Sequence, residues 1–371
     1  MRRPRDGNAF ISPKIGWDCG YDSGTEMATS TRVISAGPSG VRMEDVAREA
    51  GVSLVTVSRA INLPTKVAPR TLAEVRAAIE RLGYVPNLTA GSLASNRSQI
   101  VAAVVPTISN LVFSETIDSL ARTLADGGYQ LLLGQSLYRP REELALVNAF
   151  LGRRVDGLFL TGCSQDAALI ARLRRSNIPV VQTWDLPSGP EDGTLVDMAV
   201  GFSNAAAGRL AARHLLSRGR RALGFIGAEE QRSRQRLEGF REEAAAAGVP
   251  DVAAELIRPP VRVDQAAARL AQLLARRPDL DAVFCNNDLL AAGVLFECQR
   301  RGLAVPGQLA VIGFGDMSIA EAAFPKLTTV RVHRGEMGER AGQLLLARLA
   351  NKDPGETRID IGFELVERAS T

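Results

Sequence analysis

Short β-rich runs alternate with segments of helical periodicity from Val101 to near the C-terminus. Five runs precede residue 203 and four follow it: VAAVVP, YQLLLG, VDGLFLTG, IPVVQTW and VDMAVGF, then ALGFIGA, AELIR, DAVFCNND and LAVIGFG. Strands that alternate with helices in this way predict parallel sheets flanked by helices. The two sets therefore predict two α/β subdomains, with a ligand cleft between them at the carboxyl ends of the strands.

The C-terminal part of the chain is expected to pass between the subdomains more than once. The segment LTTVRVHRGEMGERAGQLLLARL is expected to return to the first subdomain, and FELVER to the second. We therefore assign about 101–202 and 328–350 to subdomain one, and about 203–327 and 355–371 to subdomain two. Several crossovers of this kind would permit hinge closure around a small ligand.

The segment VRMEDVAREAGVSLVTVSRAIN, which begins at Val41, has a different pattern and predicts two short helices joined by a tight turn. The first helix is expected over 44–50, and Gly51 allows the bend. Ser53 is a plausible N-cap for a helix over 54–61, whose Val57 and Ile61 face inward. A third helix is expected over 71–82, with Gly83 as its C-terminal cap.

Composition and charge agree with a folded protein of more than one domain. The chain has 371 residues, of which 46% are hydrophobic and 23% are charged. Residues 41–100 carry eight basic and five acidic side chains, whereas the residues from 101 onward have 32 of each. The small basic excess therefore coincides with the helical segment. It would favour contact with the phosphates of a nucleic acid there.

The features that the chain lacks exclude several classes of protein. Four scattered cysteines and two histidines predict no metal site, no disulfide framework and no cofactor. No run approaches the ~20 apolar residues of a membrane span, and no apolar segment follows the basic start, so we expect a cytoplasmic protein. Neither GxxxxGK[ST] nor a GxSxG nucleophile elbow occurs, so we expect no enzyme. Residues 1–40 are rich in Gly, Ser, Pro and Thr and are expected to form a disordered extension.

The string AxxxGVSxxTVSR resembles the DNA-binding headpiece of the lactose-repressor (LacI/GalR) family, and the resemblance continues through the rest of the chain. It implies an all-α helix-turn-helix headpiece over 41–86, a hinge helix over 87–98 and a core over 99–371. The core would be periplasmic-binding-protein-like, would bind an effector and would dimerise. A homodimer would place two headpieces on a palindromic double-stranded operator.

The resemblance also implies which residues contact DNA. Leu54, Val55 and Arg59 would read the major groove, and Arg59 suits guanine because a guanidinium can bond both O6 and N7. In the hinge, Leu93 matches the leucine that wedges into a minor-groove step. The remaining expected DNA contacts are Ser53, Thr56, Ser58, Asn62 and Asn87.

The family positions that line the effector cleft correspond to a second set of residues in this chain. Arg236 matches an arginine that commonly bonds sugar hydroxyls, and Asn287 matches a similar polar contact. After the fourth strand either Trp184 or Asp185 is expected to line the cleft. The full set of expected effector contacts is Asn110, Phe113, Trp184, Asp185, Arg234, Arg236, Asn287, Asp316 and Arg334.

Two departures from the family pattern bear on the ligand. Gly315 stands where many sugar-binding members have a first carboxylate, so that only Asp316 remains, and Arg334 stands where a proline or an apolar residue is usual. Arginine offers a bidentate partner to a desolvated carboxylate. Together with the strings VDMAVGFSN and RVHRGEMG, which resemble the gluconate-utilisation repressors of the family, these changes favour gluconate or a related sugar acid. A neutral sugar, a corepressor that strengthens DNA binding, or a transport-type sugar-binding module without DNA function are the alternatives.

Overall fold

The computed structural model describes the chain except residues 1–39, 86–96, 110, 164 and 188–192. Its internal contacts separate two compact units, Met1–Pro86 and Asn87–Thr371. The expected disordered extension, apart from Gly40, and most of the expected hinge helix lie outside the described residues. None of the described helices is long and apolar enough to cross a membrane.

The described part of the first unit, residues 40–85, contains three α-helices, labelled α1 (Met43–Glu49), α2 (Leu54–Asn62) and α3 (Pro69–Leu82), with a short 3-10 turn over Pro64–Lys66. The Ser53 hydroxyl accepts the backbone N–H of Thr56 and caps α2, as predicted. Helix α3 begins earlier than expected because Pro69 is well suited to the first turn of a helix. It ends at Gly83, whose φ of 62° lies in the left-handed region.

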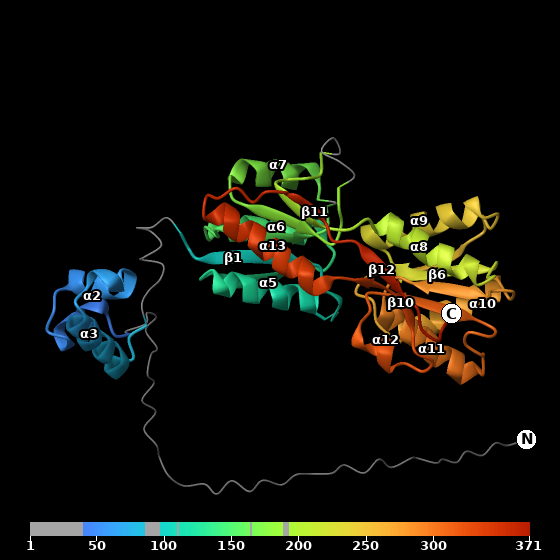
Figure 1. Ribbon diagram of the computed structural model, residues 1–371, viewed down its shortest axis with the longest axis horizontal. Coiled ribbons are helices and arrows are strands. Elements are labelled where there is room, and N and C mark those ends of the chain that lie inside the picture. The colour runs from blue at the N-terminus through green and yellow to red at the C-terminus, as the bar shows by residue number, and fades with distance from the viewer. Residues whose placement is uncertain (1–39, 86–96, 110, 164, 188–192) are drawn as a thin grey trace, which may run out of the picture. The chain divides into compact units, whose positions relative to one another are not determined.

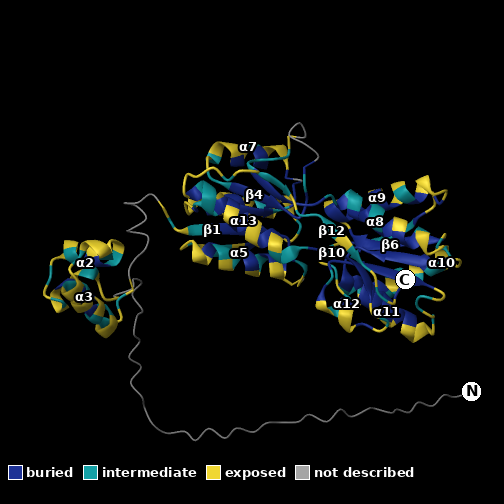
Figure 2. Ribbon diagram, in the orientation of Figure 1, coloured by how far each residue is buried: buried dark blue, intermediate teal, exposed yellow. Residues whose placement is uncertain are grey.

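A small apolar core holds the three helices together. Val46, Val57 and Val75, one from each helix, are fully buried and belong to the same cluster. The opposite face of α2 stays exposed (Figure 2). The helical pattern of the sequence therefore predicted correctly which face of α2 packs inward.

The second unit consists of two lobes, each built on a six-stranded sheet (Figure 1). The sheet of the first lobe has the order β11-β5-β4-β3-β1-β2, and that of the second has the order β12-β10-β9-β8-β6-β7. The first sheet is parallel throughout, whereas in the second β12 pairs antiparallel with β10. The strands are β1 (Ile100–Val105), β2 (Gln130–Gln135), β3 (Gly157–Thr161), β4 (Val180–Thr183), β5 (Met198–Gly201), β6 (Leu223–Ala228), β7 (Ala253–Ile257), β8 (Ala282–Cys285), β9 (Ala310–Phe314), β10 (Thr328–Val332), β11 (Arg358–Asp360) and β12 (Phe363–Val366).

Helices cover both faces of each sheet, which confirms the predicted α/β class. In the first lobe α5 and α13 pack on one face of the sheet, and α6 and α7 on the other. In the second lobe α8 and α9 pack on one face, and α10 and α11 on the other. The helices are α5 (Ser114–Asp126), α6 (Pro140–Gly152), α7 (Ala167–Ser176), α8 (Asn204–Ser217), α9 (Gln231–Ala246), α10 (Gln265–Arg276), α11 (Asp288–Arg301), α12 (Ser318–Ala322) and α13 (Arg334–Leu349), with a 3-10 turn over Leu111–Phe113.

Glycine allows α8 and α9 to approach each other closely. A Cβ on Gly239 would lie 1.9 Å from the backbone oxygen of Ala205, and a Cβ on Gly208 would lie 2.0 Å from that of Arg236. Neither backbone could yield to such a contact without shifting its helix. This close approach determines where α9, and with it Arg236, stands relative to the rest of the lobe.

The structure corrects two of the expected subdomain boundaries. Residues 328–332 were assigned to the first subdomain, but they form β10, which pairs with β9 in the second sheet. The chain passes to the first lobe only after His333, where α13 begins. Residues 358–360, which were assigned to the second subdomain, form β11 and extend the first sheet beside β5. Both errors arise because each short strand pairs with its neighbour in space and not with its neighbours in sequence.

Candidate recognition helix and ligand cavity

The exposed face of α2 presents the side chains that the sequence singled out. Leu54 and Val55 are 41% and 58% exposed, although both are large and apolar. Arg59 lies one turn further on and is exposed, and its side chain has no hydrogen bond or ion pair among the described residues. An apolar pair at the start of a capped helix, with an unpaired guanidinium one turn further on, has the groups needed to contact thymine methyls and a guanine edge.

The flanking polar residues are positioned by bonds within α2 itself. The Ser53 and Thr56 hydroxyls lie 2.9 Å apart, and Asn62 donates its Nδ2 to the Ser58 carbonyl over 3.0 Å. These bonds hold the side chains at the two ends of the helix. Asn87 and Leu93, the expected hinge contacts, lie outside the described residues.

A small cavity lies between the two lobes of the second unit, at the carboxyl ends of the strands as predicted. Its volume is about 40 Å³, room for about three water molecules. Of the expected effector contacts, Phe113, Trp184, Arg236 and Asn287 line it, whereas Asn110 lies outside the described residues. The full lining is Val112, Phe113, Tyr138, Trp184, Ala228, Glu230, Arg232, Arg236, Val261, Asn286, Asn287 and Phe314.

Two buried arginines give the cavity its charge. Arg232 donates from Nε to Glu230 over 3.1 Å, and Arg236 donates to Asn204 and lies 4.2 Å from the centroid of the Phe314 ring. The Arg232 Nη1 and the Arg236 Nε are buried and have no hydrogen-bond partner among the described residues. Unpaired buried N–H groups are costly, so these atoms are suited to an acceptor supplied by a ligand.

The ionisation of these groups leaves an excess of positive charge. Burial lowers the pKa of Arg236 to about 10, which keeps the guanidinium protonated at neutral pH. Burial opposes ionisation of Glu230, but Arg232 and Arg236 together hold its pKa below the usual value. Two cations and one anion therefore line the cavity, and a carboxylate ligand would balance them.

Tyr138, Glu230 and Arg232 also form the wall between this cavity and a larger groove of about 630 Å³. Tyr138 has a φ of 58° and its neighbour Leu137 a φ of 55°, both in the left-handed region that is unfavourable for bulky side chains. Burial raises the pKa of the Tyr138 hydroxyl to about 12, so it is neutral and can donate a hydrogen bond.

Trp184 and Asp185 have different roles. Trp184 lines the cavity and meets Phe113 edge-on, with ring centroids 5.0 Å apart. Asp185 is buried behind it and accepts hydrogen bonds from Gln235 of the second lobe and from Asn204. Burial raises the pKa of Asp185 despite these bonds. Asp185 therefore connects the lobes, and Trp184 is the residue that a ligand would touch.

Three expected contacts lie elsewhere. The Arg234 side chain is 53% exposed and pairs with Glu229. Arg232 and Arg236 are four residues apart and share one side of α9, whereas Arg234 lies on the other side. Arg334 pairs with Glu115 over 2.9 Å in a separate hollow.

Asp316 lines that separate hollow as well. It pairs with Arg331 over 2.7 Å and with Arg368 over 2.8 Å. Its carboxylate is therefore occupied within the protein. The sequence interpretation missed Glu230, Arg232 and Tyr138; the spacing of Arg232 and Arg236 was the signal that could have revealed the first arginine.

Asp288 is a buried acid next to the cavity wall, at the start of α11. It accepts the Thr329 hydroxyl and the backbone N–H of Met317, each over 2.6 Å. Burial raises the pKa of its carboxyl to about 6, against these two hydrogen bonds. Asp288 thus ties α11 to β10 and to the start of α12, and it changes charge just below neutral pH.

Comparisons with known proteins agree with this geometry. Residues 42–87 match the model of the bacterial regulatory proteins of the lacI family, and residues 212–371 match that of the periplasmic binding protein-like domain. The chain is 41% identical over 331 residues to the HTH-type transcriptional regulator GntR of Pseudomonas aeruginosa, covering 89% of this chain and 95% of that protein.

Two solved structures are also similar. A LacI-family transcriptional regulator from Silicibacter pomeroyi is 33% identical, with a TM-score of 0.82 over 89% of this chain and 99% of that one. The transcriptional regulator CelR, solved as a cellobiose complex, is 30% identical, with a TM-score of 0.64 over 89% of this chain and 100% of that one.

Proposed function

The chain belongs to the LacI family of bacterial regulatory proteins, and from this premise we propose that it is a repressor released from its operator by a sugar acid of the gluconate type. The members of this family bind DNA and regulate transcription, and they are not enzymes. The observation that carries the sugar-acid assignment is the pair of buried arginines that faces a single carboxylate in the interlobe cavity.

DNA reading is assigned to the exposed face of α2. Arg59 would bond a guanine, and Leu54 and Val55 would contact thymine methyl groups in the major groove. Ser53, Thr56, Ser58 and Asn62 would lie near the phosphates. The exposure of two large apolar side chains beside an unpaired arginine supports this assignment.

The carboxylate of the ligand is assigned to Arg232 and Arg236, and its hydroxyls to Asn287 and Tyr138. This differs from the expectation that Arg334 binds the carboxylate, because Arg334 does not line the interlobe cavity; it lies in a separate hollow, where it pairs with Glu115. A six-carbon sugar acid needs more room than the described cavity offers. Binding therefore requires the lobes or the Tyr138 wall to move, and such a movement would couple the ligand to DNA binding.

A homodimer would match a palindromic operator, since two-fold protein symmetry maps onto two-fold sequence symmetry. The second unit exposes apolar side chains that an interface would bury. They are Ile108, Leu111 and Leu133 in the first lobe and Phe296 and Phe324 in the second. Exposed apolar groups on both lobes support an interface that would transmit lobe movement between the two protomers.

The proposal is tested with an operator selected from random duplexes by the wild-type protein. Arg59→Ala should weaken operator binding by roughly tenfold or more, because a bidentate guanine contact contributes about 1–3 kcal/mol. In parallel, a thermal-shift screen of gluconate, 2-ketogluconate, 6-phosphogluconate and neutral hexoses identifies the ligand class, since a ligand of the native state raises the midpoint. Unchanged operator binding by Arg59→Ala would count against the DNA assignment.

A neutral sugar is the second candidate ligand, because the 30% identical regulator CelR was solved with cellobiose. The excess of buried guanidinium groups over carboxylates favours the acid. A midpoint raised by a neutral hexose and not by any sugar acid would select the neutral sugar. An effect of the opposite sign, in which the ligand strengthens operator binding, would identify a corepressor.

A further inference from the structure

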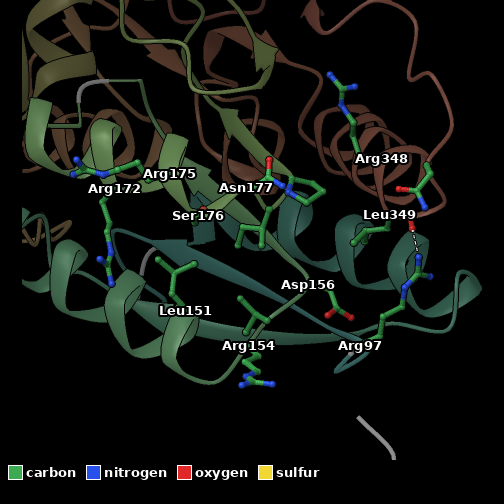
Figure 3. A pocket seen from close by; sticks show the side chains of 14 residues that line it. Arg97, Leu151, Arg154, Asp156, Arg172, Arg175, Ser176, Asn177, Arg348 and Leu349 are labelled. Atoms are coloured by element: carbon green, nitrogen blue, oxygen red, sulfur yellow. Dashed lines mark hydrogen bonds between the residues drawn. The ribbon is translucent and has the colours of Figure 1, made fainter. Parts of the chain in front are cut away.

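Five arginines line a hollow at the amino-terminal edge of the first sheet (Figure 3). The hollow has a volume of about 640 Å³ and shares no lining residue with the interlobe cavity. The helices of a parallel sheet end where the next strands begin, so the ends of α6, α7 and α13 meet at this edge. The arginines are Arg97, Arg154, Arg172, Arg175 and Arg348.

The single acid among the lining residues does not neutralise this charge. Asp156 accepts the backbone N–H groups of Ser98 and Gln99 over 3.0 and 2.8 Å. Its carboxylate therefore holds the chain at the entrance to β1. Two of the five arginines have partners, since Arg348 pairs with Asp197 over 3.2 Å and Arg97 donates to the Leu349 carbonyl over 3.0 Å. The carboxylates of Asp156 and Asp197 do not balance five guanidinium groups.

Three of the arginines have no role within the described part of the protein. Arg154, Arg172 and Arg175 are exposed and have no side-chain hydrogen bond or ion pair to any described residue. Arg174 lies between Arg172 and Arg175 in the sequence and has a structural role, since it donates to the carbonyls of Gly193 and Leu195. The three unpaired arginines of the hollow make no such bonds to described residues.

We propose that this arginine hollow binds phosphate groups of the DNA backbone. Its three unpaired guanidinium groups are exposed around an open hollow, which suits an extended polyanion better than an enclosed small ligand. The proposal rests on the proposed DNA-binding function. Only residues 86–96 separate Arg97 from the helical unit, and eleven residues span at most about 40 Å. DNA bound by α2 is therefore available to the hollow at high effective concentration.

The test measures the binding of full-length protein to a random-sequence duplex between about 50 and 200 mM salt. Phosphate contacts do not depend on sequence, so no operator is needed. The double variant Arg172→Gln/Arg175→Gln should make the slope of log affinity against log salt shallower by about 0.9 for each phosphate that the protein no longer neutralises. The double variant should weaken the binding of operator and of random DNA by the same factor.

The control Arg122→Gln/Arg262→Gln removes the same charge from exposed ion pairs outside the hollow and should keep the wild-type slope.

The outcomes are distinct. If the wild type does not bind DNA, the proposed function itself fails. If the wild type binds and the double variant keeps its slope, the arginine hollow does not contact DNA and the inference is overturned. A thermal-shift titration with tripolyphosphate distinguishes DNA phosphates from a small phosphorylated ion as the ligand of the hollow. If the double variant is no longer stabilised by tripolyphosphate but keeps the wild-type DNA slope, the hollow binds a small phosphorylated ion instead, which also overturns the inference.

Discussion

At the scale of single residues, the cavity depends on which side of α9 an arginine occupies. Arg232 and Arg236 are buried with unpaired N–H groups, whereas Arg234 pairs with Glu229 on the surface. All three lie within five residues of sequence. The chemistry of the site therefore follows from helical periodicity and could not be inferred from residue type alone.

Replacing these arginines one at a time should distinguish a direct contact with the ligand from a general effect of positive charge. Arg236→Gln should weaken gluconate binding by roughly tenfold to a hundredfold, because a charge-assisted hydrogen bond to a buried carboxylate contributes about 1.5–3 kcal/mol. Arg234→Gln removes the same charge and should bind as the wild type does. Isothermal titration calorimetry measures both, and equal losses of affinity in the two variants would contradict the assignment.

Asp288 should make stability depend on pH. Its folded pKa of about 6 lies above the ordinary value of 3.8, so the folded state holds this proton more tightly than the unfolded state. Its contribution is therefore most favourable below about pH 4, and it is lost as the pH rises towards 6. Asp288→Asn keeps an acceptor for Met317 and should remove this dependence.

The measurement is the difference in unfolding free energy between Asp288→Asn and the wild type, by urea denaturation at several pH values. The unfolding free energy of the variant minus that of the wild type should increase by roughly 1–3 kcal/mol between pH 4 and pH 7. A difference that stays constant over that interval would contradict the raised pKa.

At the scale of elements, the close crossing of α8 and α9 positions the buried arginines. Gly239→Ala would place a Cβ against the backbone of Ala205 and should reduce the unfolding free energy by about 1–3 kcal/mol. Gly152→Ala is the matched control, since a Cβ there meets nothing within 4 Å. Urea denaturation compares them, and an equally small effect of both would show that the crossing tolerates a methyl group.

The elements themselves were largely predictable. The nine β-rich runs correspond to β1 through β9 because the strands of parallel sheets covered by helices are largely continuous apolar runs. Helix α2 was predicted because Ser53 and Val57 mark its cap and its inner face. Strand β11 has only three residues, of the sequence RID, and carries no apolar pattern. Its place beside β5 depends on tertiary contact, which the local sequence does not encode.

At the scale of the whole molecule, the exposed apolar groups predict a dimer. Phe324 is 82% exposed, and Phe324→Glu should dissociate the dimer by placing a charge in the interface. Analytical ultracentrifugation should show the wild type as a dimer and the variant shifted to monomer, with weaker operator binding. A variant that remains dimeric would remove Phe324 from the interface.

A sugar acid bound in the interlobe cavity should control operator binding. Fluorescence anisotropy of a labelled operator tests it directly, with gluconate added to the wild type and to Arg236→Gln. Gluconate should weaken operator binding by the wild type at least tenfold and leave the variant bound. An operator affinity that gluconate does not change in the wild type, while a neutral hexose lowers it in both proteins, would contradict control by a sugar acid.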